Sequence, residues 1–226
     1  MNLSIFGSDS LSGKAFLQYA LNEKSIKNIY VYSRKNGNNC YIDLIKPSTY
    51  QILKKNNSNL WISYTPIWIF ANFLQNLYEN NKSIIGKLDG IIAFSSTSAE
   101  TKKHSFNSFD KDLYKKLITS EEKLLAIAKK LKIKIVIIRP TLIYGKISNF
   151  HDKNLSKIIR IMRLIPIIII PSRTGFRQPI HISQLSKVTL KYIEKIKSAK
   201  VNDKIYEVIS IGGDENISYL DMLKKY

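Results

Sequence analysis

Short apolar runs alternate with longer amphipathic segments through most of the chain. A run of about four to eight apolar residues predicts a buried strand, and a longer segment with apolar residues every three or four positions predicts a helix. The strands expected on this basis occupy residues 3–7, 28–34, 40–44, 60–66, 88–98 and 134–145. The helices expected between them occupy residues 13–23, 48–56, 67–80 and 113–131, and Ser48 is expected to cap the second of these. This alternation is typical of a parallel sheet with crossover helices, so the sequence predicts an α/β fold.

Composition limits the class of protein. The chain has 226 residues, of which 44% are hydrophobic, and this suits one globular unit. The single cysteine, Cys40, excludes an internal disulfide framework and fits a reducing compartment. Met1 leads directly into a strand-like run without the basic segment of a secretory signal, and the longest apolar segment, residues 164–171, is too short to cross a bilayer. We therefore expect a cytoplasmic protein with no membrane partner, and a homodimer is compatible with these features.

The chain is strongly basic, with a formal net charge of +19. A basic patch would suit nucleic acid or an anionic lipid surface as a partner. The lysines are instead scattered in pairs near the ends or outer faces of expected helices, at residues 54–55, 102–103, 115–116, 129–130 and 224–225. This distribution favours a solvated surface over nucleic-acid binding.

The first expected strand runs into a loop of small residues, GSDSLSG at positions 7–13, and then into a helix. The start of a helix offers free amides and a positive dipole end, both of which favour a pyrophosphate. Gly7 would make the tight turn, and Gly13 would let the helix pack close to the strand. Ser10 stands at the middle position of the loop, where a glycine is usual. The loop therefore indicates dinucleotide binding, although small loops of this kind also serve simply as turns.

Ser33 and Arg34 end the second expected strand, where a dinucleotide-binding unit contacts the ribose of adenosine. An acidic residue there would bind the ribose 2′-hydroxyl, whereas a guanidinium can pair with a 2′-phosphate. No Asp or Glu occupies this position, so the sequence favours NADP(H) over NAD(H). The alternative interpretation of Arg34 is a surface residue of a very basic protein.

Further segments carry a resemblance to a known family. They read IDL at 42–44, YTPIW at 64–68, FSSTSAETK at 94–102, EEKLL at 121–125, IIRPTLIYG at 137–145 and GFRQPIHISQL at 175–185. In this order they resemble NAD(P)-dependent epimerases and dehydratases of the extended or atypical short-chain dehydrogenase/reductase superfamily, nucleotide-sugar epimerases in particular. RPTLIYG and RQPIHI are the specific segments. The resemblance implies a Rossmann-type doubly wound parallel sheet with a small C-terminal substrate lobe.

The resemblance also implies binding residues. The cofactor would contact Gly7, Ser10, Leu11, Gly13, Ser33, Arg34, Asp43, Leu44, Tyr64, Pro66, Pro140 and Thr141, the last two near the nicotinamide. Asp43 and Leu44 would lie near the adenine. Gln178 and His181 would border the substrate. Asp43 could instead cap a strand end, and His181 could be a half-buried packing residue.

Members of this superfamily move a hydride between the nicotinamide and a carbonyl or carbinol carbon. A tyrosine exchanges the hydroxyl proton, a Ser or Thr hydrogen-bonds the same oxygen, and a lysine four residues after the tyrosine lowers the pKa of the tyrosine. The resemblance places Thr97 at the hydroxyl position and Tyr114 at the tyrosine, with Ile118 where the lysine would be. Lys102 is the nearest loop residue that could supply the charge. Tyr114 could equally be an ordinary aromatic residue of an amphipathic helix.

The character of the chain changes after Gly145. Helices are expected at residues 154–166, 184–198 and 218–226, and short strands at 167–170 and 204–210. We therefore expect an NAD(P)-binding Rossmann domain at residues 1–145 and a substrate-binding lobe at residues 146–226, which the abrupt last helix suggests is shortened.

Together these features predict an NAD(P)-dependent oxidoreductase or epimerase that acts on a nucleotide sugar or a similar carbonyl or carbinol compound. The alternative is an NAD(P)-binding protein without efficient catalysis that serves as a sensor or assembly subunit. Ile118 in the lysine position favours the alternative, whereas the intact RPTLIYG and RQPIHI segments favour the enzyme. No metal site is expected, because the three histidines are far apart in the sequence and one cysteine cannot build a zinc site.

Overall fold

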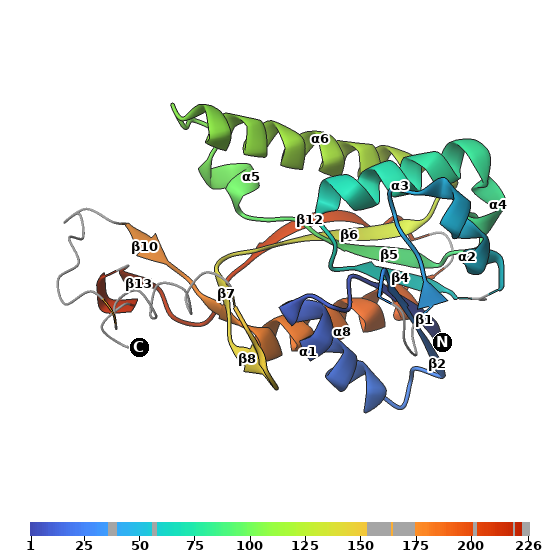
Figure 1. Cartoon of the computed structure of the whole chain (residues 1–226), viewed down its shortest axis with the longest axis horizontal. Coiled ribbons are helices and arrows are strands. Elements are labelled where there is room, and N and C mark those ends of the chain that lie inside the picture. Colours follow the sequence, from blue (N-terminus) through green and yellow to red (C-terminus); the bar gives the residue numbers. More distant parts are fainter. Residues whose placement is uncertain are drawn as a thin grey trace.

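A seven-stranded parallel sheet forms the centre of the molecule in the computed structural model (Figure 1). The structure describes residues 1–35, 40–55, 58–152, 164, 175–200, 203–218 and 220–222. The strands of the sheet are β1 (Asn2–Phe6), β2 (Asn28–Ser33), β3 (Cys40–Tyr41), β4 (Leu60–Ser63), β5 (Gly90–Phe94), β6 (Lys134–Pro140) and β12 (Tyr206–Ile211). Their order is β12-β6-β5-β4-β1-β2-β3, with every neighbouring pair parallel. The order reverses between β1 and β4, which confirms the predicted doubly wound arrangement.

Helices cover both faces of this sheet (Figure 1). One face carries α1 (Leu11–Leu21) and α8 (Ile182–Ser198), and the other carries α3 (Ile67–Asn80) and α6 (Ser108–Leu131). The connections contain shorter helices, which are η1 (Pro47–Gln51), α2 (Ile52–Lys55), α4 (Lys82–Ile85) and α5 (Ser98–Thr101). None of the helices described is both long enough and apolar enough to pass through a bilayer.

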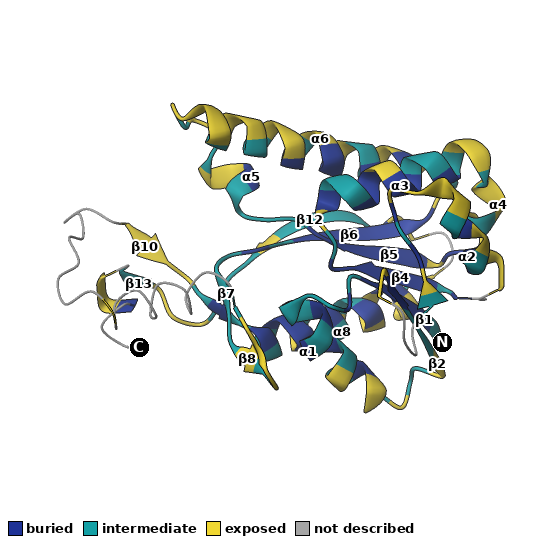
Figure 2. Ribbon diagram, in the orientation of Figure 1, coloured by how far each residue is buried: buried dark blue, intermediate teal, exposed yellow. Residues whose placement is uncertain are grey.

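The central strands are buried on both sides because helices cover both faces, and Figure 2 shows these strands in dark blue. On β4, Trp61 belongs to the core beneath α3 and α6, while Ile62 belongs to the core beneath α1 and α8. The Phe6 ring stacks on Tyr32 with 4.9 Å between centroids and meets Trp61 edge-on at 5.1 Å. This packing holds the carboxyl ends of β1 and β2 side by side, so the loops that follow them meet.

The remaining strands form two-stranded pieces outside the main sheet. They are β7 (Ile143–Tyr144), β8 (Lys146–Ile147), β9 (Phe150–His151), β10 (Phe176–Arg177), β11 (Ile180–His181) and β13 (Ile217–Ser218). In Figure 1, β10 and β13 project beyond one end of the sheet. However, α8 and β12 belong to the main layers. The described residues after Gly145 thus contribute both to the main sheet with its helices and to the projecting strands. The division into two domains at Gly145 stays a prediction.

Two helices begin differently from the sequence prediction. The expected helix at 48–56 is a 3₁₀ turn followed by α2, and it has no side-chain cap. Pro47 starts this turn, because its φ angle is preset for a helix, so Ser48 lies inside the turn and cannot cap it. The long helix α6 begins five residues before the expected residue 113, because the Asn107 side chain caps it by accepting from the Phe109 N–H at 2.9 Å.

Other expected elements are shorter or lie elsewhere. The strand expected at 134–145 divides, since β6 ends at Pro140 and β7 leaves the sheet to pair with β11. The strand expected at 88–98 ends at Phe94. Except for residue 164, the helix at 154–166 and the strand at 167–170 lie outside the described residues. Of the last expected helix, residue 218 belongs to β13, residues 220–222 are helical, and the others are outside the described residues.

Candidate functional site

Two cavities lie at the carboxyl edge of the sheet in the described part of the chain. The β1–β2 cavity, of about 630 Å³, lies between the loops that follow β1, β2 and β4 and the segment 42–45. The β5–β6 cavity, of about 880 Å³, lies between the loops that follow β5, β6 and β12 and the strand β10. This edge, beside the reversal of strand order, is where doubly wound sheets bind ligands.

The loop after β1 requires glycine at two positions. Gly7 has a φ of +75°, and a Cβ there would lie 2.8 Å from the backbone nitrogen of Thr65. A Cβ on Gly13 would lie 2.5 Å from the carbonyl oxygen of Gly7. Both distances are too short for any other residue. The loop therefore turns tightly against the first turn of α1, as the sequence suggests.

Ser10, which stands in place of the usual middle glycine, caps α1. Its Oγ accepts from the Gly13 N–H at 3.1 Å and donates to the Gly7 carbonyl oxygen at 2.8 Å. The serine therefore stabilises the turn through hydrogen bonds of its side chain, whereas a glycine would allow the turn through its conformational freedom. Ser10 also lines the β1–β2 cavity, so the positive end of the α1 dipole lies at this cavity.

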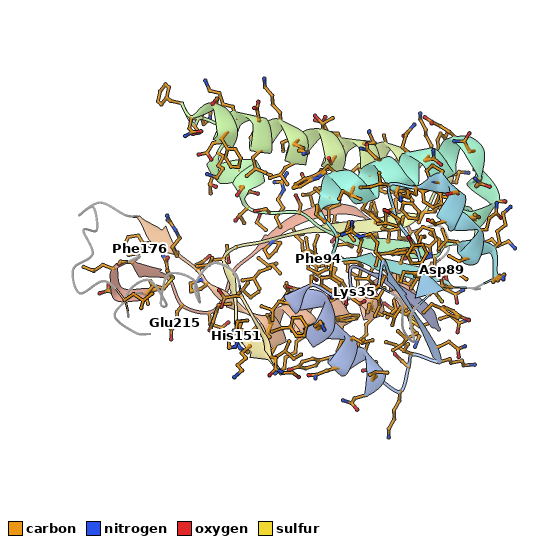
Figure 3. The ribbon with its side chains drawn as sticks, viewed as in Figure 1. Lys35, Asp89, Phe94, His151, Phe176 and Glu215 are labelled. Atoms are coloured by element: carbon orange, nitrogen blue, oxygen red, sulfur yellow. The ribbon has the colours of Figure 1, made fainter. Side chains whose placement is uncertain are left out.

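The β1–β2 cavity brings together most of the predicted cofactor residues. Those that line it are Gly7, Ser10, Ser33, Arg34, Asp43, Leu44, Tyr64 and Pro66. Leu11 and Gly13 do not line it. Sequence reasoning missed Asp9 and Lys35, which also line this cavity. The signal for Asp9 was its position in the small-residue loop; Lys35, which directly follows Arg34, is labelled in Figure 3.

Two tyrosines support the walls of this cavity. The Tyr50 hydroxyl donates to the Leu44 carbonyl oxygen at 2.8 Å, and burial, with Asp43 nearby, raises the pKa of Tyr50 to about 12. The Tyr64 hydroxyl donates to Thr189 of α8 at 3.3 Å, and burial raises the pKa of Tyr64. Both hydroxyls therefore keep their protons and their hydrogen bonds at neutral pH, and these bonds hold the loops that form the cavity.

The Asp43 carboxylate is part of a turn as well as of the cavity. It accepts from the Ile45 N–H at 3.1 Å, while the Asp43 N–H donates to the Thr49 hydroxyl at 3.1 Å. These bonds agree with the alternative interpretation of Asp43 as a cap at a strand end. Asp43 nevertheless lines the β1–β2 cavity.

Half of the residues that line the β5–β6 cavity carry a hydroxyl or a side-chain amide group, and the others are apolar or charged. Predicted residues in its lining are Thr97, Lys102, Pro140, Thr141 and Gln178. The Thr97 hydroxyl donates to the Pro140 carbonyl oxygen at 3.3 Å, and the Thr141 hydroxyl donates to the carbonyl oxygen of Gln178. Phe176 of β10, labelled in Figure 3, lines this cavity and is itself largely exposed.

The structure does not bring the predicted catalytic residues together. Tyr114 is half-buried on α6 and lines neither cavity, and one turn further along the helix Leu117 and Ile118 pack in the core. The Lys102 ammonium lies at the β5–β6 cavity but pairs with Asp110 at 2.5 Å. This pairing lowers the pKa of Asp110. Of the predicted trio, only Thr97 and Lys102 share a cavity.

His181 is the cap of α8. Its Nδ1 lies 2.7 Å from the Ser183 hydroxyl and 3.3 Å from the Ser183 N–H, and the Gln184 side chain accepts from the His181 N–H at 3.0 Å. This reciprocal arrangement is a capping box. His181 lines neither cavity. Within the described ranges, no three His, Cys, Asp or Glu side chains are grouped to hold a metal ion.

A buried ionic network fixes the inner wall of the β5–β6 cavity, and sequence reasoning missed it. Glu121 of α6 is only 3% exposed and accepts from Arg139 of β6 through Nε at 2.9 Å and through Nη2, and from the Ser95 hydroxyl at 2.5 Å. Arg139 also donates to Glu100 at 2.8 Å, and the Ser210 hydroxyl donates to Glu100 at 2.6 Å. Bonds from Ser210 and Arg139 lower the pKa of Glu100, and the bond to Glu121 raises the pKa of Arg139. The network ties β5, β6 and β12 to α5 and α6.

Comparison with known proteins supports the fold. No protein-family model and no curated protein matches the sequence. Among solved structures, a dTDP-glucose 4,6-dehydratase from Bacillus anthracis in complex with NAD is 13% identical with a TM-score of 0.73, over 100% of this chain and 79% of that one. A UDP-glucuronic acid 4-epimerase from Bacillus cereus in complex with UDP-glucuronic acid and NAD is 19% identical with a TM-score of 0.68, over 100% and 82%.

A third similar structure is a GDP-D-glycero-L-gluco-heptose synthase from Campylobacter jejuni, determined in the presence of NADPH. It is 13% identical with a TM-score of 0.71, over 99% of this chain and 83% of that one. At such identities the likeness is one of fold. The resemblance to epimerases and dehydratases is thereby confirmed at the level of a shared Rossmann-type architecture.

Proposed function

We propose that the chain binds a nicotinamide dinucleotide, NADP(H) in preference to NAD(H), and with it oxidises, reduces or epimerises a nucleotide sugar or a related carbonyl or carbinol compound. The observation that carries this proposal is the pair of cavities along one edge of a doubly wound sheet. The first begins at a glycine-containing loop and a helix start. The second is lined by hydroxyl groups.

The residues of the β1–β2 cavity fit a dinucleotide. Gly7 and Ser10 line it at the start of α1, where the helix dipole and amides suit a pyrophosphate. Apolar side chains of Ile42, Leu44 and Ile69 offer a surface for adenine. Similar structures were determined with NAD or with NADPH. We assign the NADP(H) preference to Arg34, which lines this cavity.

The β5–β6 cavity would then receive the substrate beside the nicotinamide. When bound, the nicotinamide supplies or accepts a hydride. Thr97 would hydrogen-bond the reacting oxygen, and Gln178 of the same cavity would contact the sugar portion. The assignment of Tyr114 as proton carrier and Lys102 as its supporting charge stays a prediction, as do the homodimer and the cytoplasmic location.

One observation favours a second candidate function. Tyr114 lines neither cavity, and the Lys102 ammonium already pairs with Asp110. A chain built in this way would bind the dinucleotide without an efficient proton carrier. It would then serve as a sensor or an assembly subunit.

Calorimetric titration with NADP⁺ and NAD⁺ tests dinucleotide binding. We expect Gly13→Asp to abolish binding of both, because it places bulk and negative charge at the start of α1. Gly86→Asp makes the same change at an exposed position that lines neither cavity, and it should bind as the wild type does. Unchanged affinity in a folded Gly13→Asp variant would contradict the proposed site.

Turnover separates the two candidate functions. The wild-type protein, loaded with either cofactor, would be incubated with a panel of nucleotide sugars and simple ketones while nicotinamide absorbance and product sugars are followed. Turnover of a nucleotide sugar supports the enzyme. Tight dinucleotide binding with no turnover supports the sensor or assembly subunit.

A further inference from the structure

A carboxylate lies beside the end of β2, although the sequence has no acidic residue there. It belongs to Asp9, in the loop that follows β1, and the Ser33 hydroxyl donates to its Oδ2 at 2.5 Å. The two residues are 24 positions apart in the chain. They meet because β1 and β2 are adjacent parallel strands, with Phe6 paired to Tyr32, so that their following loops leave the same edge of the sheet.

The position of this carboxylate is well fixed. Ser33 is buried, and its Oγ also accepts from the Lys35 N–H at 3.0 Å, which commits the hydroxyl proton to Asp9. Asp9 itself is partly exposed and lines the β1–β2 cavity. Arg34 and Lys35 line the same cavity. The same cavity thus holds the basic side chains of Arg34 and Lys35 together with the carboxylates of Asp9 and Asp43. The Asp9 carboxylate, at the end of β2, lies where we expect the ribose of a bound adenosine.

We propose that Asp9 is a specificity-determining residue that limits the preference for NADP(H) over NAD(H). The inference rests on the proposed function. An Asp carboxylate accepts hydrogen bonds from a ribose hydroxyl but repels a phosphate at the same position. Arg34 and Lys35 attract that phosphate. The chain therefore accepts both dinucleotides, and the ratio of their affinities reflects the balance between Asp9 and its basic neighbours.

The test compares two carboxylates of the same cavity. Asp9→Asn removes the charge but keeps an oxygen that accepts from Ser33, and we expect about a tenfold rise in the ratio of NADP⁺ to NAD⁺ affinity. Asp43→Asn removes an equal charge from a residue that lines the same cavity but that the resemblance places near the adenine. Its amide oxygen can still accept from the Ile45 N–H. We expect Asp43→Asn to change both affinities by the same factor and leave their ratio unaltered.

Dissociation constants for both dinucleotides would be measured by calorimetry at one ionic strength, with circular dichroism to verify folding. A ratio in Asp9→Asn within about twofold of the wild-type ratio would overturn the inference. An equal shift in Asp43→Asn would also overturn it, because the effect would then be one of overall charge. If the wild type binds neither dinucleotide, the proposed function fails as well. Binding with an unaltered ratio overturns the role of Asp9 alone.

Discussion

Arg139→Met tests the buried network behind the β5–β6 cavity. Methionine keeps much of the length of the arginine side chain but removes its charge and its donors. Glu121 is 3% exposed and accepts from Arg139 at two nitrogen atoms, so the variant leaves Glu121 with the Ser95 hydroxyl as the partner that remains from this network. The Arg139 side chain is 15% exposed, so little water reaches the pair.

The expected loss of stability is large. Removing one partner of a buried ion pair costs about 3–5 kcal/mol, because the remaining charge stays uncompensated. Native proteins have free energies of unfolding of about 5–15 kcal/mol, so a substantial fraction would be lost. For a chain of this size we expect the melting temperature to fall by about 6–20 °C.

Urea unfolding, followed by circular dichroism, measures this loss. Arg34→Met is the matched control, since Arg34 is exposed, and we expect it to change the free energy of unfolding by less than about 0.5 kcal/mol. The double variant Arg139→Met with Glu121→Leu should recover part of the loss, because both buried charges are then gone. A loss below about 1 kcal/mol in Arg139→Met, or a double variant less stable than the single one, would refute the reasoning.

Two further predictions concern the β5–β6 cavity. Tyr114→Phe should lower kcat by about a hundredfold if Tyr114 carries the proton as the sequence predicts. A kcat within about twofold of the wild-type value would contradict that assignment and agree with the position of Tyr114 outside both cavities. Ser210→Ala should lower the free energy of unfolding near neutral pH, because the Ser210 bond is the main cause of the lowered pKa of Glu100. A lowered carboxyl pKa stabilises the fold at pH values above 4.5, the ordinary pKa, and this stabilisation is lost as the pH falls below that value. The free energies of unfolding of the two proteins, measured with urea, should therefore converge in acid. A difference that does not depend on pH would contradict this assignment.

The main sheet was predictable because its central strands are buried on both faces and read as apolar runs. The sequence did not predict that β12 joins the main sheet beside β6, because the order of the strands depends on contacts between residues far apart in the chain. β12 pairs with β6 across about seventy residues, with Val208 opposite Ile137. A local pattern of apolar residues carries no information on that pairing.

The site shows a similar division. The glycine loop was recognisable because a turn against a helix start imposes local limits at Gly7 and Gly13. The Asp9–Ser33 bond depends on the register of two strands, and no local pattern encodes it. The sequence also did not predict which face of α6 packs against the core. Successive residues of a helix point about 100° apart, so the direction in which Tyr114 points depends on which α6 residues are buried, and only the structure shows this.

The position of α8 has a consequence for synthesis of the chain. Gly90 of β5 lies so close to α8 that a Cβ there would be 2.6 Å from Cγ2 of Ile196. The same face of the sheet contains Ile92 and Val136, which pack in one cluster with α8 side chains. All the strands from β1 to β6 leave the ribosome before α8 does. Until α8 is made, α1 is the only one of the two long helices that can cover this face of the sheet. The nascent protein therefore completes this part of its core only after residue 198 is made.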